Sequence, residues 1–287
     1  MKILVSFESR VRPDSTGNYY LKAFRDMGHE VDHVLPSDIM FVKGGYDLYF
    51  RCDDGMYAEW NKELHPSIFQ VIDTHLDVDF RLKMANEGEF DLVSVAQKEG
   101  INLPWNSKAV WGPLACDAEI HHVGERDKIF DGVFVGNFHT QYASERIETV
   151  HAFFDVVPKL FFGSRTFKEL TEKYAQSKLV LNQAIHNDPL NMRFFEALCS
   201  GSCLVSSRLK EGETLGFVDG VHYAGYSSLP ELREVVKDLL ENDAKREGIA
   251  REGRRAATQH TYASRLRDLM EQLPEKTEKT NGFAISR

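Results

Sequence analysis

The chain has 287 residues, enough for two α/β domains, and its 42% apolar and 28% charged residues are those of an ordinary globular protein. Its net charge of −9 argues against a protein built mainly to hold a phosphate backbone, although a local basic groove would survive that average. No apolar run reaches the length of a membrane span, and Met1 leads directly into a strand-like segment, so we expect neither a signal peptide nor stable membrane insertion.

Short strand-like runs alternate with helical patterns in the first third of the chain. Strands are predicted at 2–7, 31–35, 47–51, 68–73 and 91–96, and a helical pattern, YYLKAFRDMG, follows the first of them. Gly28 marks the end of that helix, because glycine readily adopts the left-handed conformation in which helices often end. Strands separated by helical segments favour a parallel sheet with crossover connections.

The second half of the chain repeats this alternation. Strands are predicted at 131–137, 159–163, 178–183 and 202–207, and the chain closes with three helical patterns. The alternation predicts an α/β protein of two Rossmann-like domains, 1–120 and 121–260, that face each other across a cleft. The last helical pattern, 261–273, is expected to pack back toward the N-terminal domain, and 274–287 to form a flexible tail.

Four cysteines are present: Cys52, Cys116, Cys199 and Cys203. Their spacing is not that of a metal site, and Cys199 and Cys203 lie among apolar neighbours. We therefore expect reduced core residues and a cytoplasmic location.

The loops that follow Phe7, Asp73, Gly136 and Gln183 are expected at the cleft, because ligands of open parallel sheets bind at the carboxyl ends of the strands. These loops contain the charged and glycine-containing turns of the chain.

In the first of these loops, Thr16 and Gly17 come immediately before a helix. A hydroxyl and a glycine at a helix N-terminus suit a phosphate, because free N–H groups and the helix dipole point there. The alternative is structural: Ser15 or Thr16 caps the helix, and Gly17 eases the turn.

The turn after the strand at 131–137 is a second candidate. Gly136 and the adjacent Asn137 allow a ligand to approach the backbone, and Arg146 in the following helix can reach a phosphate oxygen. The alternative is a plain strand-to-helix turn with a solvated arginine.

The segment NMRFFEALCSGSCLV, residues 191–205, places a charged pair in an otherwise apolar helix. Arg193 and Glu196 are three residues apart and therefore share a helix face. Taken alone, Arg193 and Glu196 are predicted to form an exposed ion pair. The alternative is that they bind a ligand. With Asn182 and Asp188 just before the helix, the site would offer a cation and free N–H groups to a diphosphate, and carboxylates to sugar hydroxyls.

The motifs FVGN…R…LVLNQ…DPLNMRFFEALCSG…LVSS, followed by FVDGVHYAGYSSLPELREVV and QHTYASRLRDL, resemble the C-terminal domain of GT-B-type glycosyltransferases. Within these, the chain is most similar to the spore-maturation (CgeB-like) group, which is related to the group 1 glycosyl transferases. The resemblance covers 131–269 and is only topological before Pro113. It implies the GT-B fold and transfer of a sugar from a nucleotide-diphosphate sugar, UDP-linked as a first guess, with no further cofactor.

The resemblance also implies roles for particular residues. Glu196 corresponds to the second acid of the family's E-x7-E pattern, which holds the ribose hydroxyls of the donor. Asp188 takes the place of the first acid as aspartate rather than glutamate, a departure that bears on the position of the donor sugar. Arg193 and Arg146 are similar to residues that meet the diphosphate. The donor-binding set is then Thr16, Gly17, Gly136, Asn137, Arg146, Asn182, Asn191, Met192, Arg193 and Glu196.

The chemistry expected of this site is metal-independent, because cationic side chains and backbone donors can stabilise a leaving diphosphate. The letters of a metal-binding DxD occur at Asp77 and Asp79, but inside a helical pattern rather than at a strand end. Retention of the anomeric configuration is favoured over inversion by the resemblance.

On the acceptor side, Asp73 and His75 end a predicted strand at the cleft and are the acid–base candidates. With Asp188 they form the predicted catalytic set. Asp73 would deprotonate the acceptor hydroxyl in an inverting reaction, whereas in a retaining one both side chains would orient the sugars. The structural alternative is that Asp73 caps a helix beginning near Leu76.

The acceptor itself is not determined by the sequence. The short N-terminal half suggests an open face for a glycan, another polymer or a modified nucleic-acid base, and the acidic balance gives the last less weight. Three alternatives remain: a sugar-nucleotide epimerase, a phosphorylase of the same architecture, and a non-catalytic nucleotide-sugar-binding or surface-assembly protein with a decayed site.

Overall fold

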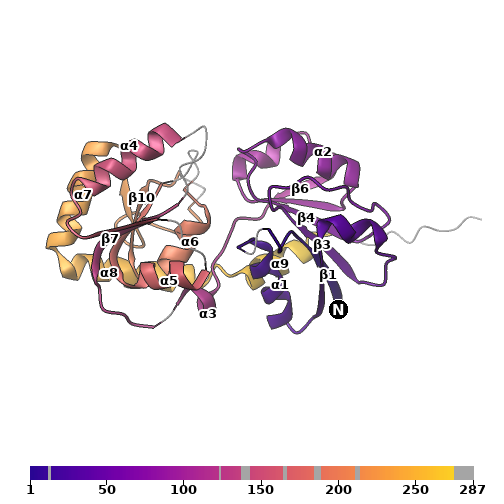
Figure 1. The fold of residues 1–287 in the computed structure, drawn as a ribbon, viewed down its shortest axis with the longest axis horizontal. Helices are drawn as coiled ribbons and strands as arrows, with labels where there is room; N and C mark the ends of the chain where they lie inside the picture. Colours follow the sequence, from indigo (N-terminus) through magenta and orange to yellow (C-terminus); the bar gives the residue numbers. More distant parts are fainter. Residues whose placement is uncertain are drawn as a thin grey trace, which may run out of the picture.

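The computed structural model describes residues 1–11, 14–122, 124–136, 143–163, 167–183, 189–210 and 214–274. These form two α/β bodies side by side, each with a parallel sheet between helices (Figure 1). The predicted α/β class and the arrangement as two Rossmann-like sheets are confirmed. The limits 1–120, 121–260 and 261–273 stay predictions.

The N-terminal sheet has six parallel strands in the order β2-β1-β3-β4-β5-β6. Its central strands β3 and β4 are buried along their whole length, as expected of parallel strands covered on both faces. The elements are β1 Lys2–Ser6, α1 Gly17–Asp26, β2 Glu30–Val34, η1 Pro36–Phe41, β3 Leu48–Cys52, β4 Ser67–Val71, α2 Val78–Gly88, β5 Leu92–Val95, η2 Lys98–Asn102, β6 Lys108–Trp111 and α3 Ala118–His121.

The C-terminal sheet has five parallel strands in the order β11-β10-β9-β7-β8. The short edge strand β11 was not predicted, because three residues are too few to show a periodic pattern. The elements are β7 Phe130–Val135, α4 Ala143–Phe154, β8 Leu160–Gly163, α5 Phe167–Ala175, β9 Ser177–Asn182, α6 Met192–Cys199, β10 Cys203–Ser207, β11 Ala224–Tyr226, α7 Leu229–Glu241, α8 Asp243–Ala257 and α9 Tyr262–Met270.

The last helix returns to the first. The Tyr262 ring of α9 stacks on the Tyr19 ring of α1, with centroids 5.0 Å apart and planes 8° from parallel. The Arg265 Nε–H donates to the Pro113 carbonyl at 3.2 Å, and the Cys116 N–H donates to the His260 carbonyl at 3.0 Å. The α9 helix therefore lies against α1, although α1 ends at Asp26 and α9 begins only at Tyr262 (Figure 1).

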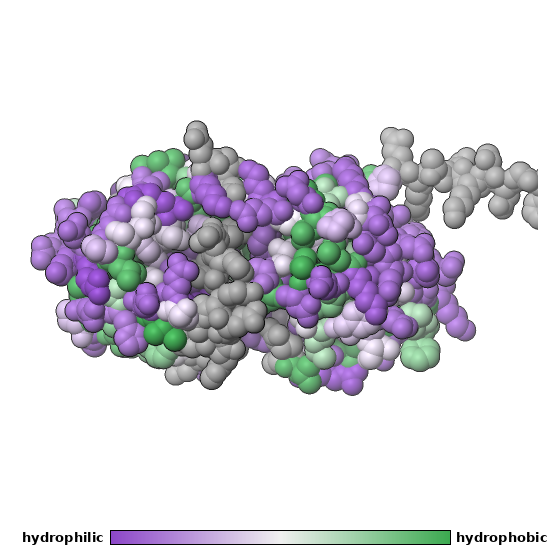
Figure 2. All heavy atoms as spheres, turned by 90° about the horizontal axis from the view of Figure 1, so that it is seen from above, coloured by the Kyte–Doolittle hydropathy of each residue, from purple (hydrophilic) through white to green (hydrophobic). Residues whose placement is uncertain are grey.

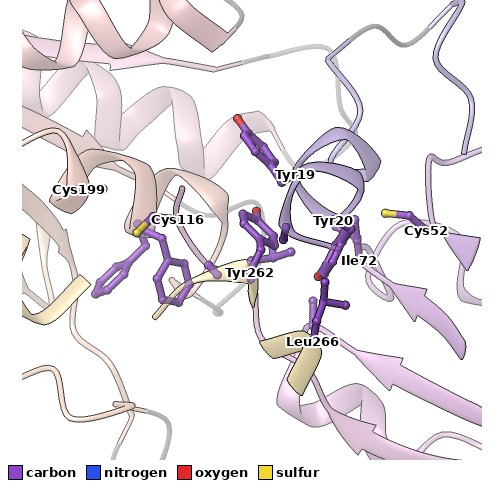
Figure 3. Close-up of a cluster of buried hydrophobic side chains, with 14 of the residues drawn as sticks. Tyr19, Tyr20, Cys52, Ile72, Cys116, Cys199, Tyr262 and Leu266 are labelled. Atoms are coloured by element: carbon purple, nitrogen blue, oxygen red, sulfur yellow. The ribbon is translucent and has the colours of Figure 1, made fainter. Parts of the chain in front are cut away.

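One buried cluster joins the two bodies. It contains Tyr20, Cys52 and Ile72 from the N-terminal sheet and its helices, and Cys116 and Cys199 from the junction and α6 (Figure 3). The four cysteines are buried free thiols, as predicted. In the described ranges, every helix falls short of the length and apolarity that a bilayer crossing requires.

Candidate functional site

A cavity of about 690 Å³ lies between the two bodies, at the carboxyl ends of both sheets. Its walls come from both halves of the chain, so neither half forms the site alone. The cavity brings together seven of the predicted site residues: Thr16, Asp73, His75, Arg146, Asn191, Met192 and Arg193.

The N-terminus of α6 forms the C-terminal wall. The Asn191 side chain caps this helix by accepting from the Phe194 N–H at 3.1 Å. Met192 is the first helical residue, and its sulfur accepts a hydrogen bond from the Thr16 hydroxyl of the opposite wall at 3.2 Å. The cap leaves the remaining first-turn N–H groups and the helix dipole directed at the cavity, which suits an anion.

Arg193 is held at this wall by three backbone and side-chain oxygens. Its Nε–H donates to the Val135 carbonyl at 2.8 Å, and its Nη1 donates to the Gln183 carbonyl at 3.2 Å and to Asn182 Oδ1 at 3.4 Å. The guanidinium also lies over the Phe134 ring, 4.8 Å from its centroid. An arginine fixed in this way is oriented before any ligand arrives.

Gly136 makes room for that guanidinium. A Cβ atom on Gly136 would lie 2.7 Å from Nη2 of Arg193 and 2.9 Å from Cζ of Phe134. The sequence interpretation was that Gly136 lets a ligand approach the backbone. The structure gives it a different role, because what approaches the backbone is the Arg193 side chain.

Arg146 stands beside Arg193. Its Nη2 donates to the same Gln183 carbonyl at 3.2 Å, and only 5% of the residue is exposed. Burial, together with the neighbouring Arg193 charge, lowers the pKa of Arg146 to about 10. The alternative of a solvated arginine is therefore wrong. Two adjacent cations at a helix N-terminus repel each other, and a bound anion relieves that repulsion.

Asn182 does not line the cavity. It is fully buried, and its Nδ2 donates to the Pro189 carbonyl at 2.8 Å and to the Ser206 hydroxyl at 3.0 Å. Because its Oδ1 accepts from Arg193, Asn182 acts on the site by fixing that arginine and the start of the α6 segment.

Glu196 also lies outside the cavity lining, buried behind it. The alternative of an exposed ion pair with Arg193 is therefore wrong. The Tyr19 hydroxyl of α1 donates to Glu196 Oε1 at 3.4 Å, and His121 Nε2 of α3 lies 3.6 Å from the same oxygen. Burial raises the pKa of Glu196 to about 7, although Arg193 and the Tyr19 hydroxyl act in the opposite direction.

The tautomer of His121 follows from its other ring nitrogen. The Asp117 N–H donates to His121 Nδ1 at 3.0 Å, so Nδ1 carries no proton, and Nε2–H donates to the Tyr19 hydroxyl at 3.1 Å. Burial lowers the pKa of His121 to about 4, in agreement with a neutral ring. A directed chain of hydrogen bonds thus runs from Asp117 through His121 and Tyr19 to Glu196, and it joins both bodies.

On the N-terminal wall, Thr16 lines the cavity but Gly17 does not. A Cβ on Gly17 would lie 2.2 Å from Cγ of Phe7, so this glycine permits α1 to pack on the end of β1. The Ser15 hydroxyl accepts from the Gly17 N–H at 3.3 Å, whereas Thr16 makes no side-chain cap. The structural alternative for this loop therefore holds for Ser15 and Gly17, and Asp14, Ser15 and Thr16 line the cavity.

Asp73 and His75 line the same wall in the segment between β4 and α2. The structural alternative that Asp73 caps a helix near Leu76 is wrong, because α2 begins at Val78 and Asp77 occupies its N-cap position. The acid–base role of Asp73 and His75 stays a prediction.

Two ion pairs at this wall were not predicted from the sequence. Arg51 donates to both carboxylate oxygens of Asp54, from Nη1 at 2.8 Å and from Nη2 at 3.0 Å. Arg81 donates from Nε to Asp53 Oδ2 at 2.5 Å, and that oxygen also accepts from the Ile72 N–H at 3.1 Å. The signal that could have identified them is Asp-Asp-Gly directly after the buried strand β3, at the sheet edge where ligands bind.

Two predicted residues, Asn137 and Asp188, lie outside the described residues. Within the described part of the chain, no group of three or more His, Cys, Asp or Glu side chains could hold a metal ion.

Comparisons with known proteins agree with this geometry. Residues 134–271 match the model of a family described as glycosyl transferase-like. No curated protein sequence is significantly similar to the chain.

Solved structures share its fold over nearly the whole length. Anabaena Alr3699/HepE in complex with UDP and glucose has a TM-score of 0.67 at 12% identity, covering 95% of this chain and 99% of that one. An α-glucosyltransferase in complex with UDP-glucose and DNA containing an abasic site has a TM-score of 0.69 at 10% identity, covering 96% and 100%. T4 phage BGT in complex with its UDP-glucose substrate has a TM-score of 0.62 at 14% identity, covering 95% and 99%.

The predicted resemblance to GT-B-type glycosyltransferases is thereby confirmed, while membership of the CgeB-like group stays a prediction. The chain has the GT-B fold, and its residues 134–271 are similar to the glycosyl transferase-like family.

Proposed function

We propose that the protein is a glycosyltransferase that moves a sugar from a UDP-sugar to an acceptor hydroxyl. The observation that carries the proposal is the pair of fixed arginines, Arg146 and Arg193, beside the N-terminus of α6 at the wall of the cavity. That arrangement matches the doubly charged diphosphate of a nucleotide-sugar. Similar folds crystallised with UDP or UDP-glucose support uridine as the base.

In the proposed reaction, the bond between the anomeric carbon and the β-phosphate oxygen breaks, and the acceptor oxygen bonds to that carbon. Arg193 and Arg146 balance the charge that develops on the departing UDP. If the reaction inverts, the acceptor proton passes to Asp73 or His75. If it retains, which we favour, the proton passes to the departing β-phosphate oxygen, and both side chains orient the sugars. The chemistry proposed needs no metal, and a cytoplasmic location stays a prediction.

Glu196 is proposed to hold the ribose hydroxyls. In the described conformation its Oε1 accepts from Tyr19 and the side chain is buried behind the cavity lining, so the ribose can reach Glu196 only if the side chains that cover it move. Donor binding is then linked to the relative position of α1 and α6.

The test is titration calorimetry with UDP, GDP, TDP and ADP, together with an assay of UDP-glucose hydrolysis. We expect UDP to bind and Arg193→Ala to weaken binding about 10- to 100-fold, the value of one or two charge-assisted hydrogen bonds. Arg233→Ala is the matched control, because Arg233 lies on α7 and pairs with Asp155 at the surface.

Unchanged UDP affinity in Arg193→Ala would refute the donor site. Binding of UDP without hydrolysis or transfer would instead identify the non-catalytic nucleotide-sugar binder that the sequence left open.

A further inference from the structure

The segment between β4 and α2, residues 72–77, belongs to neither a helix nor a strand, yet it brings two predicted site residues to the cavity. These are Asp73 and His75. At the end of the segment, Asp77 has a φ of 73°, in the left-handed region that a residue with a Cβ seldom adopts. A stretch without helix or strand hydrogen bonds keeps one conformation only if other groups satisfy its backbone. The groups that hold this backbone therefore decide where the two side chains point.

Asp53, which directly follows β3, holds the start of the segment. Its Oδ2 accepts hydrogen bonds from the Ile72 N–H at 3.1 Å and from the Asp73 N–H at 3.4 Å. Its Oδ1 accepts from the Gly55 N–H at 2.9 Å, which fixes the carboxylate on its own loop. One carboxylate therefore joins the loops that follow two neighbouring strands, β3 and β4.

Arg81 of α2 holds the end of the segment. Its Nη1 donates to the Leu76 carbonyl at 3.1 Å and to the Asp77 carbonyl at 3.2 Å. Its Nε donates to Asp53 Oδ2 at 2.5 Å, and its Nη2 donates to Asp53 Oδ1 at 3.4 Å. The planar guanidinium reaches the carboxylate and both carbonyls at once, which a lysine ammonium cannot do. Asp53 and Arg81, the loop clamp, therefore hold residues 72–77 from both ends.

The loop clamp is buried. Hydrophilic residues cover most of the face seen in Figure 2, as expected of a protein surface in water. By contrast, the side chains of Arg81 and Asp53 are only 2% and 1% exposed. A buried ion pair adds little net stability, because the loss of hydration offsets the attraction. Its charge-assisted hydrogen bonds are nevertheless short and directional, so the loop clamp suits the fixing of geometry better than the stabilising of the fold.

We infer that Asp53 and Arg81 are positioning residues of the proposed transfer reaction. The inference rests on the proposed function and adds to it the residues that set the acceptor side of the site. Through the backbone of 72–77, the loop clamp orients Asp73 and His75 toward the sugar and the acceptor. A displacement of about 1 Å at a reacting group lowers a rate by up to about 100-fold, so the orientation of this segment matters to the chemical step.

The first experiment compares Arg81→Lys with the wild type. Lysine keeps a positive charge beside Asp53, so no buried carboxylate is left unpaired, but its single nitrogen does not reproduce the fork of the guanidinium. We expect kcat for UDP-glucose hydrolysis to fall about 10- to 100-fold, while the UDP affinity measured by calorimetry stays within about twofold. Unchanged kcat, or a loss of UDP affinity as large as the loss of kcat, would overturn the inference.

Arg246→Lys is the matched control. The Arg246 side chain is only 7% exposed, donates to the Leu239 carbonyl at 2.8 Å and pairs with Asp243 at 2.6 Å, but it does not line the cavity. The same substitution there disturbs a buried arginine of the C-terminal body and should leave kcat per folded protein unchanged. Equal losses of kcat in the two variants would show a general structural effect and overturn the inference.

The second experiment needs no substrate. Amide hydrogen exchange across 72–77, followed by mass spectrometry, should be about tenfold or more faster in Arg81→Lys than in the wild type. Exchange in β5, Leu92–Val95, should stay the same, because this strand bonds to β4 and β6 rather than to the loop clamp. Unchanged exchange across 72–77 would overturn the inference. It would mean that Gln97, whose Oε1 accepts from the Thr74 N–H at 3.1 Å, holds the segment without the loop clamp.

The outcomes separate this inference from the proposed function. Absence of UDP binding and of UDP-glucose hydrolysis in the wild type contradicts the proposed function. Normal hydrolysis by the wild type together with unchanged kcat in Arg81→Lys contradicts only the positioning role.

Discussion

Replacing Glu196 by glutamine should make the protein more stable and less active. Burial raises the pKa of the Glu196 carboxyl to about 7, with Arg193 and the Tyr19 hydroxyl opposing the rise. In an unfolded chain, a glutamate has a pKa of about 4.3. Between these values the folded protein keeps the proton that the unfolded chain releases. The free energy of unfolding therefore falls as pH rises from about 4 to about 7.

The size of the effect follows from the difference in pKa. Each unit is about 1.4 kcal/mol, so burying Glu196 costs about 4 kcal/mol of stability at pH 8 and about 1 kcal/mol at pH 5. Glutamine is uncharged at both pH values and still offers an oxygen to the Tyr19 hydroxyl. We expect Glu196→Gln to raise the free energy of unfolding by about 4 kcal/mol at pH 8 and by about 1 kcal/mol at pH 5.

Urea unfolding at pH 5 and pH 8 measures the difference, with Glu234→Gln, an exposed glutamate of α7, as the control. UDP-glucose hydrolysis should fall in Glu196→Gln at both pH values, because a residue that costs stability is retained for function. A variant that is less stable than the wild type by the same amount at both pH values would refute the reasoning. It would mean that the carboxylate is ionised and well bonded in the folded state.

Three further predictions concern the neighbours of Glu196 and Arg193. Burial lowers the pKa of His121 to about 4. The neutral ring therefore contributes fully to stability above about pH 6.5, and the free energy of unfolding falls by about 3 kcal/mol as the pH falls toward 4. In the Glu196→Gln background, His121→Gln should abolish that pH slope in urea unfolding, and an unchanged slope contradicts the assignment. Tyr19→Phe leaves the His121 Nε2–H without its acceptor and should lower the free energy of unfolding by about 1–3 kcal/mol in urea unfolding. A variant as stable as the wild type would contradict the hydrogen-bond chain. Gly136→Ala brings a methyl group to 2.7 Å from Arg193 Nη2 and should weaken UDP binding about tenfold or more in calorimetry, whereas unchanged affinity would show that Arg193 adapts.

Local patterns in the sequence predict much of the fold. The strands β1, β3, β4, β7 and β9 are short apolar runs bounded by polar or glycine-containing segments, which one stretch of chain is enough to show. The order of the parallel strands then places their carboxyl ends at one edge, so Thr16, Asp73 and Arg193 could be assigned to a cleft before any coordinates.

The sequence did not show which polar side chains form hydrogen bonds and ion pairs within the protein rather than with a ligand. Arg51 and Asp54 are three residues apart across the end of a strand, where the alternation of strand residues does not predict contact, and the turn brings them together. Gly17 and Gly136 resemble ligand-facing glycines in the sequence, but both make room for neighbouring side chains.

The tertiary structure alone decided the surroundings of Glu196. Its sequence neighbour Arg193 predicts a surface pair on one helix face, whereas its partners Tyr19 and His121 come from elements 177 and 75 residues away. Whether a carboxylate is solvated or buried depends on what packs over it, and here Tyr19 of α1 and His121 of α3 lie against it. Local pattern determined that a helix carries an acid at this position, and packing between the two bodies determined how readily that acid holds its proton.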